Sequence, residues 1–416
     1  MNRFNEVFDN FTESNIFPKS ASYNILESSR RYVSAKSSAN DSSIQSYRPP
    51  KEQLRALVGK VIKYPEVIGP HPDFANLKMG ETEKHYAVSV FADIQGSTIL
   101  GTKFTLEQVR FIKNGILTTA IDIFQAFDGH VHRLQGDAIF VFFGRKNITK
   151  YDSIVDALNA SASLQEFCKS SLAPKFEELG FPSIRIRIGI DFGDDHQVLW
   201  SHYGIKNCNE ITTTSVHTDL AAKMQHKSPA GGIIIGDNVR EYLDLPDEFY
   251  TIRKRTKNGE LIEDGFVINN AHMKYRMWLF DWERYLNRFL LFPREPKFSY
   301  RAPNDFKYRC FYRYSGEENY PHEYLANCGS LPKECHLKFS LEIPSWLRYT
   351  EIEWKVLNRG LEAKNEDSLD FDMPDFMNRT FCLQSTAYKG HHYMLCTIKN
   401  QGRIIAQEHF GVFVRN

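Results

Sequence analysis

Two aspartates stand where apolar runs end or begin. Asp93 closes the run YAVSVFAD, and Asp137 opens the run DAIFVFFG further along the chain. Two carboxylates that meet at strand ends repel each other unless a cation lies between them. Such hard oxygen ligands favour Mg²⁺ or Mn²⁺, which complete their coordination shell with water and substrate phosphates. If the fold brings Asp93 and Asp137 together, the pair predicts metal-dependent chemistry on a phosphorylated substrate.

The residues after Asp93 suit a phosphate group. Gly96 permits close approach of the backbone, and the main-chain N–H groups of Gln95, Gly96, Ser97 and Thr98 would open toward the helix that follows. The plainer interpretation is that Asp93 only ends a strand and Asp137 only makes a turn. The presence of both, with a helical segment between them, favours a functional site.

Hydrophobic periodicity predicts the elements that must position the two aspartates. A strand at 85–94, a helix from 106 capped by Thr105, and a hairpin joined at Gly136 and Asp137 come first. A helix at 152–172 capped by Asp152 or Ser153, a strand at 183–193 with one wet face, a helix from 217 and a strand at 231–237 follow. This order predicts an α+β fold with a ferredoxin-like or palm arrangement, an antiparallel-centred sheet and helices on one face. In it, Asp93 and Asp137 meet at one edge.

At this point the sequence resembles a known family. The motifs FADIQGST, RLQGDAIFVFFG, IRIGIDFG and DLAAKM occur in the order and spacing of the class III nucleotidyl cyclase domain, over about 85–250. The resemblance implies a homodimer with two active sites at its interface, each holding two Mn²⁺ or Mg²⁺ ions. It assigns the metal ligands to Asp93, Asp137 and the carbonyl of Ile94. It also implies in-line attack of a ribose 3′-hydroxyl on the α-phosphorus, with pyrophosphate leaving.

The same resemblance places base-reading and transition-state residues, which a partner protomer would supply. Arg133 and Thr212 fall at the base-reading positions, and neither the adenine nor the guanine pattern is present. A guanidinium suits the O2 and N3 acceptors of cytosine or the carbonyls of uracil. Asp219 and Lys223 replace the family's ribose-orienting Asn and transition-state Arg, so Lys223 would supply a point charge and Asp219 would accept from a ribose hydroxyl. The pyrophosphate-binding residue is not assigned.

The rest of the chain divides into segments that differ in composition and hydrophobic pattern. Residues 1–60 predict a helical segment with a Ser-rich linker, 61–270 the cyclase domain, 271–299 a helical connector, and 300–416 a β-sandwich of short alternating strands. The runs IEWKVLNRGLEA, STAYKGHHYMLCTI and FGVFV resemble the AGS-C sensor domain. Trp354 is expected in the core, and His391 and His392 at a strand edge or facing a ligand rather than binding a metal.

Composition narrows the function classes. At 416 residues the chain is long enough for two folded units, and its net charge of +1, without a long basic block, argues against nucleic acid as a partner. No window is apolar enough for a membrane helix, and the start is too polar for a signal peptide. Seven scattered cysteines without CxxC pairs fit reduced thiols. We expect a cytoplasmic protein.

Together the two resemblances imply a pyrimidine cyclase of the Pycsar anti-phage family. The favoured activity is cytidylate cyclase, which converts CTP to 3′,5′-cyclic CMP, a messenger that activates a separate effector. The alternatives are uridylate cyclase acting on UTP, then adenylate cyclase, then a sensor that binds nucleotide without turning it over, suggested by Asp219 and Lys223. The C-terminal domain is expected to sense a phage-derived trigger.

Overall fold

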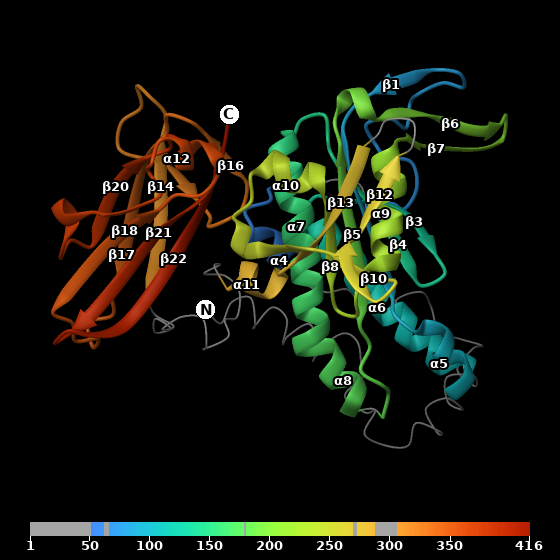
Figure 1. Cartoon of the computed structure of the whole chain (residues 1–416), viewed down its shortest axis with the longest axis horizontal. Helices are drawn as coiled ribbons and strands as arrows, with labels where there is room; N and C mark the ends of the chain where they lie inside the picture. The colour runs from blue at the N-terminus through green and yellow to red at the C-terminus, as the bar shows by residue number, and fades with distance from the viewer. Residues whose placement is uncertain (1–50, 62–65, 179, 269–272, 288–305) are drawn as a thin grey trace, which may run out of the picture. The chain divides into compact units, whose positions relative to one another are not determined.

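The computed structural model describes residues 51–61, 66–178, 180–268, 273–287 and 306–416. These residues form two compact units, whose elements Figure 1 labels. One unit comprises the described residues up to Phe143 together with Asn159–Ile233, and the other comprises Gly144–Leu158 together with the described residues from Ile234 onward. The expected Ser-rich linker lies outside the described residues.

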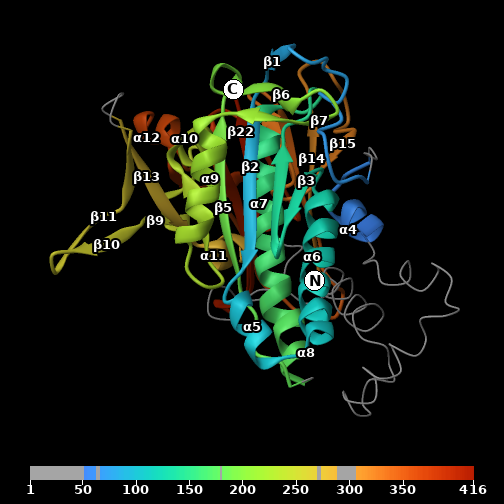
Figure 2. The same cartoon turned by 90° about the vertical axis from the view of Figure 1, so that its right-hand side faces the viewer.

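The first unit is built on a central antiparallel sheet. Its strands are β2 (Ala87–Ile94), β3 (His130–Gln135), β4 (Ala138–Phe143) and β5 (Ile186–Gly193). They lie in the order β5-β2-β4-β3, with β2 antiparallel to its neighbours β5 and β4; Figure 2 labels β5, β2 and β3 of this sheet. Val88 and Val90 on β2 are fully buried. This arrangement confirms the predicted α+β fold with an antiparallel-centred sheet.

Helices of the first unit follow the predicted pattern. They are α4 (Lys51–Leu57), α5 (Ser97–Lys103), α6 (Leu106–Ala126) and α9 (Val216–Lys227). The predicted Thr105 cap of α6 is confirmed, because its side chain accepts from the backbone N–H of Gln108 in a capping box. The expectation of a wet face on β5 is wrong. A Cβ on Gly189 would lie 2.2 Å from the backbone N of Gln225, so α9 packs directly on that face.

A smaller sheet in the first unit was not predicted. It has the order β1-β6-β7, formed by β1 (Thr82–Lys84), β6 (Leu199–Ile205) and β7 (Cys208–Thr214). Trp200 on β6 is fully buried and stacks on Phe74, with ring centroids 4.2 Å apart. This packing fixes the face of β7 that carries Glu210 and Thr212.

The second unit contains one clear correction. We expected a helix through MKYRMWLFDWERYLNRF, but residues Met273–Phe280 form strand β13, and a helix, α11, is confined to Trp282–Leu286. Tyr275 and Met277 are buried while Arg276 between them is partly exposed, so the period is two rather than 3.6. Residues 288–299 of the expected connector lie outside the described residues.

The remaining elements before the C-terminal sandwich belong to both units. They are η3 (Asp247–Phe249), β8 (Ile233–Gly236), α10 (Asp237–Leu243), β9 (Tyr250–Ile252), β10 (Lys254–Lys257), β11 (Glu260–Glu263) and β12 (Gly265–Ile268). Helix α7 (Lys150–Phe167) begins earlier than predicted because Thr149, not Asp152 or Ser153, accepts from the N–H of Asp152 at 3.1 Å. A π-helical turn, Cys168–Leu172, joins α7 to α8 (Ala173–Glu178), and η2 (Asp195–Gln197) lies between β5 and β6.

The predicted β-sandwich is confirmed in the C-terminal part of the second unit. One sheet has the order β15-β14-β17-β20 and the other β16-β22-β21-β18-β19. Their members are β14 (Lys307–Arg313), β15 (His322–Tyr324), β16 (Ser330–Pro332), β17 (His336–Glu342), β18 (Glu351–Leu357), β19 (Asp370–Asp372), β20 (Phe381–Ser385), β21 (Gly390–Asn400) and β22 (Arg403–Arg415), with α12 (Leu361–Asn365) and η6 (Pro374–Phe376) between strands. Trp354 is in the core, as predicted, and its indole N–H donates to the carbonyl of Arg379 at 3.0 Å.

The two histidines of β21 are fully engaged in the sandwich. His391 hydrogen-bonds to Asn327 through Nε2 and to the Tyr393 hydroxyl through Nδ1, and it stacks on Phe413. His392 accepts from the backbone N–H of Arg359 through Nδ1 and donates to the carbonyl of Tyr388 through Nε2. Because every ring nitrogen already has a protein partner, these histidines are structural.

Candidate active site

Strand register brings the two aspartates to the same end of adjacent strands. Asp93 on β2 lies opposite Ala138 on β4, and Asp137 is the residue just before Ala138. Gly136, with φ 65°, makes the tight turn that leads from β3 to Asp137. The predicted meeting of Asp93 and Asp137 at one edge of the sheet is therefore present in the fold.

Each of the two carboxylates has a cationic side chain beside it. Arg187, the residue opposite Asp93 on β5, places Nη2 2.5 Å from Asp93 Oδ2, and Gln225 of α9 donates to the same oxygen at 3.1 Å. Lys113 of α6 places Nζ 3.6 Å from Asp137 Oδ1. The Asp93 and Asp137 side chains are only 18% and 17% exposed, so this compensation of charge matters.

The donor set fits a divalent cation. Asp137 Oδ2 is buried and has no hydrogen-bond partner among the described residues. An unpaired buried carboxylate oxygen is costly unless a cation or a donor meets it. No cluster of three or more His, Cys, Asp and Glu side chains that could hold a metal occurs in the described part of the chain. The remaining ligands would therefore come from a carbonyl such as that of Ile94, from water and from a substrate.

The predicted phosphate-facing segment is only partly available. Gly96 has φ 71° and precedes α5, whose first turn holds Ser97 and Thr98 without a side-chain cap. The backbone N–H of Gln95, however, donates to the carbonyl of Arg185 at 2.9 Å. The N–H of Gln95 is thus committed to the protein, which leaves the N–H groups of Gly96, Ser97 and Thr98 as candidates for a phosphate.

The predicted base-reading residues lie near β7. Arg133 on β3 forms a two-pronged ion pair with Glu210 on β7, through Nε to Oε1 at 3.0 Å and through Nη2 to Oε2. Thr212 stands two residues after Glu210, so both side chains are on one face of β7. Sequence reasoning missed Glu210; its only signal was an acidic residue two positions before Thr212.

A buried histidine lies beside the Glu210 side chain without a hydrogen bond to it. His132 Nε2 lies 2.9 Å from Glu210 Oε1, and His132 Nδ1 lies 3.1 Å from the carbonyl oxygen of Gly69. Burial lowers the pKa of His132 to about 4, so the ring is neutral near pH 7. Because His132 carries no charge, the positive charge of Arg133 and the negative charge of Glu210 balance each other.

The predicted transition-state residues share an exposed face of α9. Asp219 and Lys223 are four residues apart, one helical turn, and both are exposed. Gln225, which contacts Asp93, is buried on another side of the same helix. Within the described residues, Asp93 and Asp137 make no hydrogen bond or ion pair with Arg133, Asp219 or Lys223. The described contacts thus do not connect Asp93 and Asp137 with the other predicted site residues.

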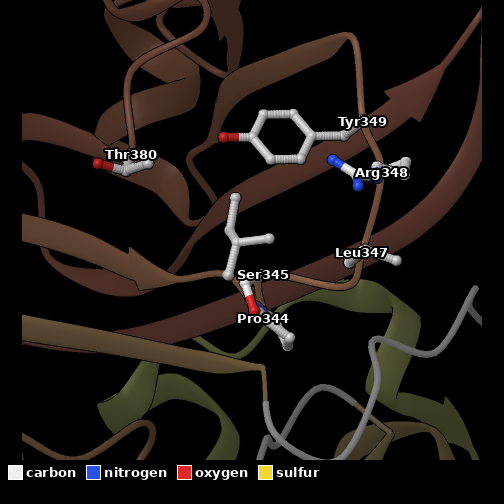
Figure 3. Close-up of a pocket in the computed structure, with 7 residues that line it drawn as sticks. Pro344, Ser345, Leu347, Arg348, Tyr349 and Thr380 are labelled. Atoms are coloured by element: carbon white, nitrogen blue, oxygen red, sulfur yellow. The ribbon is translucent and has the colours of Figure 1, made fainter.

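A cavity of about 310 Å³ lies in the C-terminal sandwich, away from these residues in the chain. Figure 3 shows its lining, which comes mainly from the loop between β17 and β18: Ile343, Pro344, Ser345, Leu347, Arg348, Tyr349 and, from the segment before β20, Thr380. It contains one guanidinium and no carboxylate. Its lining gives no ligand set for a metal.

None of the described helices combines the length and the apolar character needed to cross a bilayer.

Comparison with known proteins identifies both parts of the chain. Residues 281–415 match the family described as the Adenylyl/Guanylyl and SMODS C-terminal sensor domain. A protein of Staphylococcus aureus named cytidylate cyclase is 41% identical over 99% of this chain and 96% of its own length. An Escherichia coli protein of the same name is 32% identical over 82% of this chain and 77% of its own length.

Solved structures include similar chains. The adenylyl cyclase CyaB from P. aeruginosa is 21% identical, with a TM-score of 0.40, and the similarity covers 48% of this chain and 95% of that one. The guanylyl cyclase Cya2 is 17% identical, with a TM-score of 0.39, over 49% and 94%. The full-length relatives carry the assignment, since they align along nearly the whole sequence. The chain belongs to the cytidylate cyclase family and ends in an AGS-C sensor domain.

Proposed function

We propose that this protein converts CTP to 3′,5′-cyclic CMP and pyrophosphate. The observation that carries the proposal is the placement of Asp93 and Asp137 at the same end of β2 and β4, with an unpartnered carboxylate oxygen on Asp137 among the described residues. Relatives named cytidylate cyclase along the full chain support the choice of substrate. The placement of the two aspartates supports nucleotidyl cyclase chemistry, and the relatives together with Arg133 support the choice of base.

The reaction forms one bond and breaks one. The ribose 3′-oxygen attacks the α-phosphorus, the bond from that phosphorus to the bridging oxygen of pyrophosphate breaks, and the proton of the 3′-hydroxyl passes to water. Asp93, Asp137 and the carbonyl of Ile94 would hold Mn²⁺ or Mg²⁺, two per site, which supply charge to favour the alkoxide and stabilise the departing pyrophosphate.

The chain's own residues would orient the Asp93 carboxylate and the ribose, and would neutralise charge on the reacting phosphate. Arg187 and Gln225 hold Asp93 Oδ2 in place, which leaves its other oxygen to face the site. Lys223 would place positive charge near the developing phosphorane, and Asp219 would accept a hydrogen bond from a ribose hydroxyl. Gly96, Ser97 and Thr98 would approach the triphosphate through their backbone.

The two separate sets of residues support a homodimer. Asp93 and Asp137 belong to one set, and Arg133, Thr212, Asp219 and Lys223 to the other. In a symmetric dimer, one set from each protomer would meet the other set from its partner. Two equivalent active sites would then form.

We extend the proposal to the biological role. The product would act as a second messenger for a separate effector in anti-phage defence, and the AGS-C domain at 281–415 would respond to a phage-derived trigger in the cytoplasm. The cavity near Arg348 and Tyr349 is a candidate place for that response.

A direct test is to incubate the purified protein with Mn²⁺ and, separately, CTP, UTP, ATP and GTP, and to identify products by mass spectrometry. We expect cyclic CMP from CTP and its loss in Asp93→Ala, while the exposed control Lys206→Gln behaves like the parent. Cyclic UMP as the main product would make the protein a uridylate cyclase. Faster turnover of ATP or GTP would contradict the proposal.

A second candidate is nucleotide binding without turnover. It is favoured by one observation, that Asp219 and Lys223 stand where the family has Asn and Arg. The double variant Asp219→Asn, Lys223→Arg restores the family residues. If it gains cyclase activity over a parent that binds CTP but makes no product, the binding role is correct; a parent that turns over CTP excludes it.

A further inference from the structure

The Arg133–Glu210 pair presents an accessible, planar set of hydrogen-bonding groups. Arg133 Nε and Nη2 donate to Oε1 and Oε2 of Glu210, and their side chains remain 45% and 38% exposed. A two-pronged pair of this kind holds the guanidinium and the carboxylate in one plane. The pair is therefore both ordered and open to a ligand.

Part of the pair remains free for a ligand. A guanidinium has five N–H donors, of which Glu210 takes two. Nη1 of Arg133 has no partner among the described residues, and Nη2 keeps a second N–H. Glu210 Oε2, next to Nη2, keeps a lone pair. Along its free edge the pair offers an acceptor, Oε2, then two donors, Nη2 and Nη1.

This order is complementary to cytosine and not to uracil. The pairing edge of cytosine offers the N4 amino donor, then the N3 and O2 acceptors, and a carboxylate is the usual acceptor for the N4 amino group. Uracil offers the O4 acceptor, the N3–H donor and the O2 acceptor. Its O4 would face Glu210 Oε2, and its N3–H would face an N–H of Arg133.

We propose that Glu210 is a specificity-determining residue, which selects cytosine over uracil by accepting a hydrogen bond from the N4 amino group while Arg133 donates to N3 and O2. This inference rests on the proposed function, and it names the residue that fixes the base. His132 places Nε2 2.9 Å from Glu210 Oε1, on the oxygen that does not face the free edge. The carboxylate is held by Arg133, whose Nε and Nη2 both donate to it.

The test compares Glu210→Gln with the parent. Replacing one carboxylate oxygen by an amide nitrogen lets the substituted side chain turn its N–H₂ toward uracil O4, so the ratio of kcat/KM for CTP to that for UTP should fall by about tenfold or more. Glu260→Gln on β11 is the matched control, because it removes the same charge from an exposed site in the other unit. Melting temperatures establish that each variant is folded.

Binding separates this inference from the proposed function. Calorimetry with CTP and UTP analogues that carry a non-cleavable α–β bridge measures base preference without turnover. A parent that prefers the CTP analogue, and a Glu210→Gln variant that loses this preference, support the inference even if no cyclic CMP forms. An unchanged preference in folded Glu210→Gln, or a parent that prefers UTP, overturns it. If Glu210→Gln does not fold, Arg133→Lys decides: loss of the fork must also lower the CTP preference.

Discussion

At the scale of single residues, the protein's own cations already compensate the two carboxylates of the site. Arg187 is 19% exposed and pairs with Asp93, which is 18% exposed, and Lys113 lies beside Asp137. In a partly buried pair, removal of one partner leaves the other charge without compensation, which costs more than loss of a surface ion pair. Arg187 is therefore a positioning residue for Asp93.

We expect Arg187→Gln to lower the free energy of unfolding by about 2 kcal/mol in buffer with EDTA. Added Mn²⁺ should reduce this loss, because the ion supplies positive charge near Asp93. Urea unfolding with and without Mn²⁺ measures both effects. Arg185→Gln is the matched control, since Arg185 is exposed on the neighbouring segment. A loss of equal size with and without Mn²⁺ would show that Arg187 does not act through the carboxylate site.

A buried histidine makes stability depend on pH. Burial lowers the pKa of His392 to about 4, whereas the unfolded chain has a histidine pKa of about 6.5. Between pH 6.5 and pH 4 the unfolded state therefore binds a proton that the folded state does not, and stability falls as the pH falls. From pH 7 to pH 5 this group alone should cost about 2 kcal/mol.

The change His392→Gln removes this proton linkage. Its free energy of unfolding should be lower than that of the parent at pH 7, but it should decline less between pH 7 and pH 5. Denaturant titrations at the two pH values test this, with the exposed His196→Gln as control. An identical decline in parent and His392→Gln would contradict the linkage.

Single residues also show what the sequence could and could not predict. Asp93 and Asp137 could be predicted because each stands at the junction of an apolar run and a turn. Arg187 falls within the strand at 183–193 that was expected to have one wet face, and only the β2–β5 register places it opposite Asp93. Glu210 was missed since its pairing with Arg133 depends on a contact between β3 and β7, far apart in the chain.

At the scale of elements, the close contact of α9 with β5 positions one set of site residues. A Cβ at Gly189 would lie 2.2 Å from the backbone N of Gln225 and 2.3 Å from the carbonyl oxygen of Ala221. Only glycine allows this spacing between helix and strand. The helix so placed brings Gln225 to Asp93 and presents Asp219 and Lys223 on its exposed face.

We expect Gly189→Ala to displace α9, because backbone atoms cannot yield as a flexible side chain can. The loss should be about 2 kcal/mol or more in the free energy of unfolding, together with a drop in CTP turnover. Gly101→Ala in α5 is the control: its Cβ would meet no atom within 4 Å, and alanine favours a helix. Urea unfolding and product assays of both variants decide, and a Gly189→Ala protein as stable and active as Gly101→Ala would contradict this packing argument.

Elements with strong local signals were predicted best. The Thr105 capping box, the hairpin at Gly136 and the sandwich strands all carry such signals. The prediction of a helix over Met273–Phe280 was wrong because aromatic and basic residues without turn signals fit the helical period and the strand period equally well. Pairing with β9 and β12 makes this segment a strand. The β1-β6-β7 sheet escaped prediction, since most residues of β6 and β7 are exposed or only partly buried and the runs contain few apolar residues.

At the scale of the whole molecule, the proposed active site requires two chains. In the proposed mechanism Asp93 and Asp137 would bind the metal ions, and the base-reading and transition-state residues would come from the partner protomer, so a complete site would need one set from each protomer. In a heterodimer of two chains that are inactivated in different sets, both substitutions would fall in the same active site. The other active site would carry neither substitution and would be intact.

Mixing Asp137→Ala with Lys223→Ala should restore about a quarter of parent activity, because half of randomly formed dimers are mixed and each has one intact site. Light scattering should show dimers for all samples. A mixture of Asp93→Ala with Asp137→Ala damages the same set and should stay inactive. Failure of the first mixture to recover, with dimers present, would contradict the shared site.

The central claim is that the protein cyclises CTP and that this reaction depends on the carboxylates of Asp93 and Asp137. The most direct measurement is single-turnover formation of cyclic CMP from CTP in Mn²⁺ by the parent, Asp137→Asn and Lys206→Gln. The account predicts rapid product formation by the parent and Lys206→Gln, and a reduction of about a thousandfold in Asp137→Asn, which keeps the size of the side chain but loses its charge. Parent-like product formation by Asp137→Asn would contradict it.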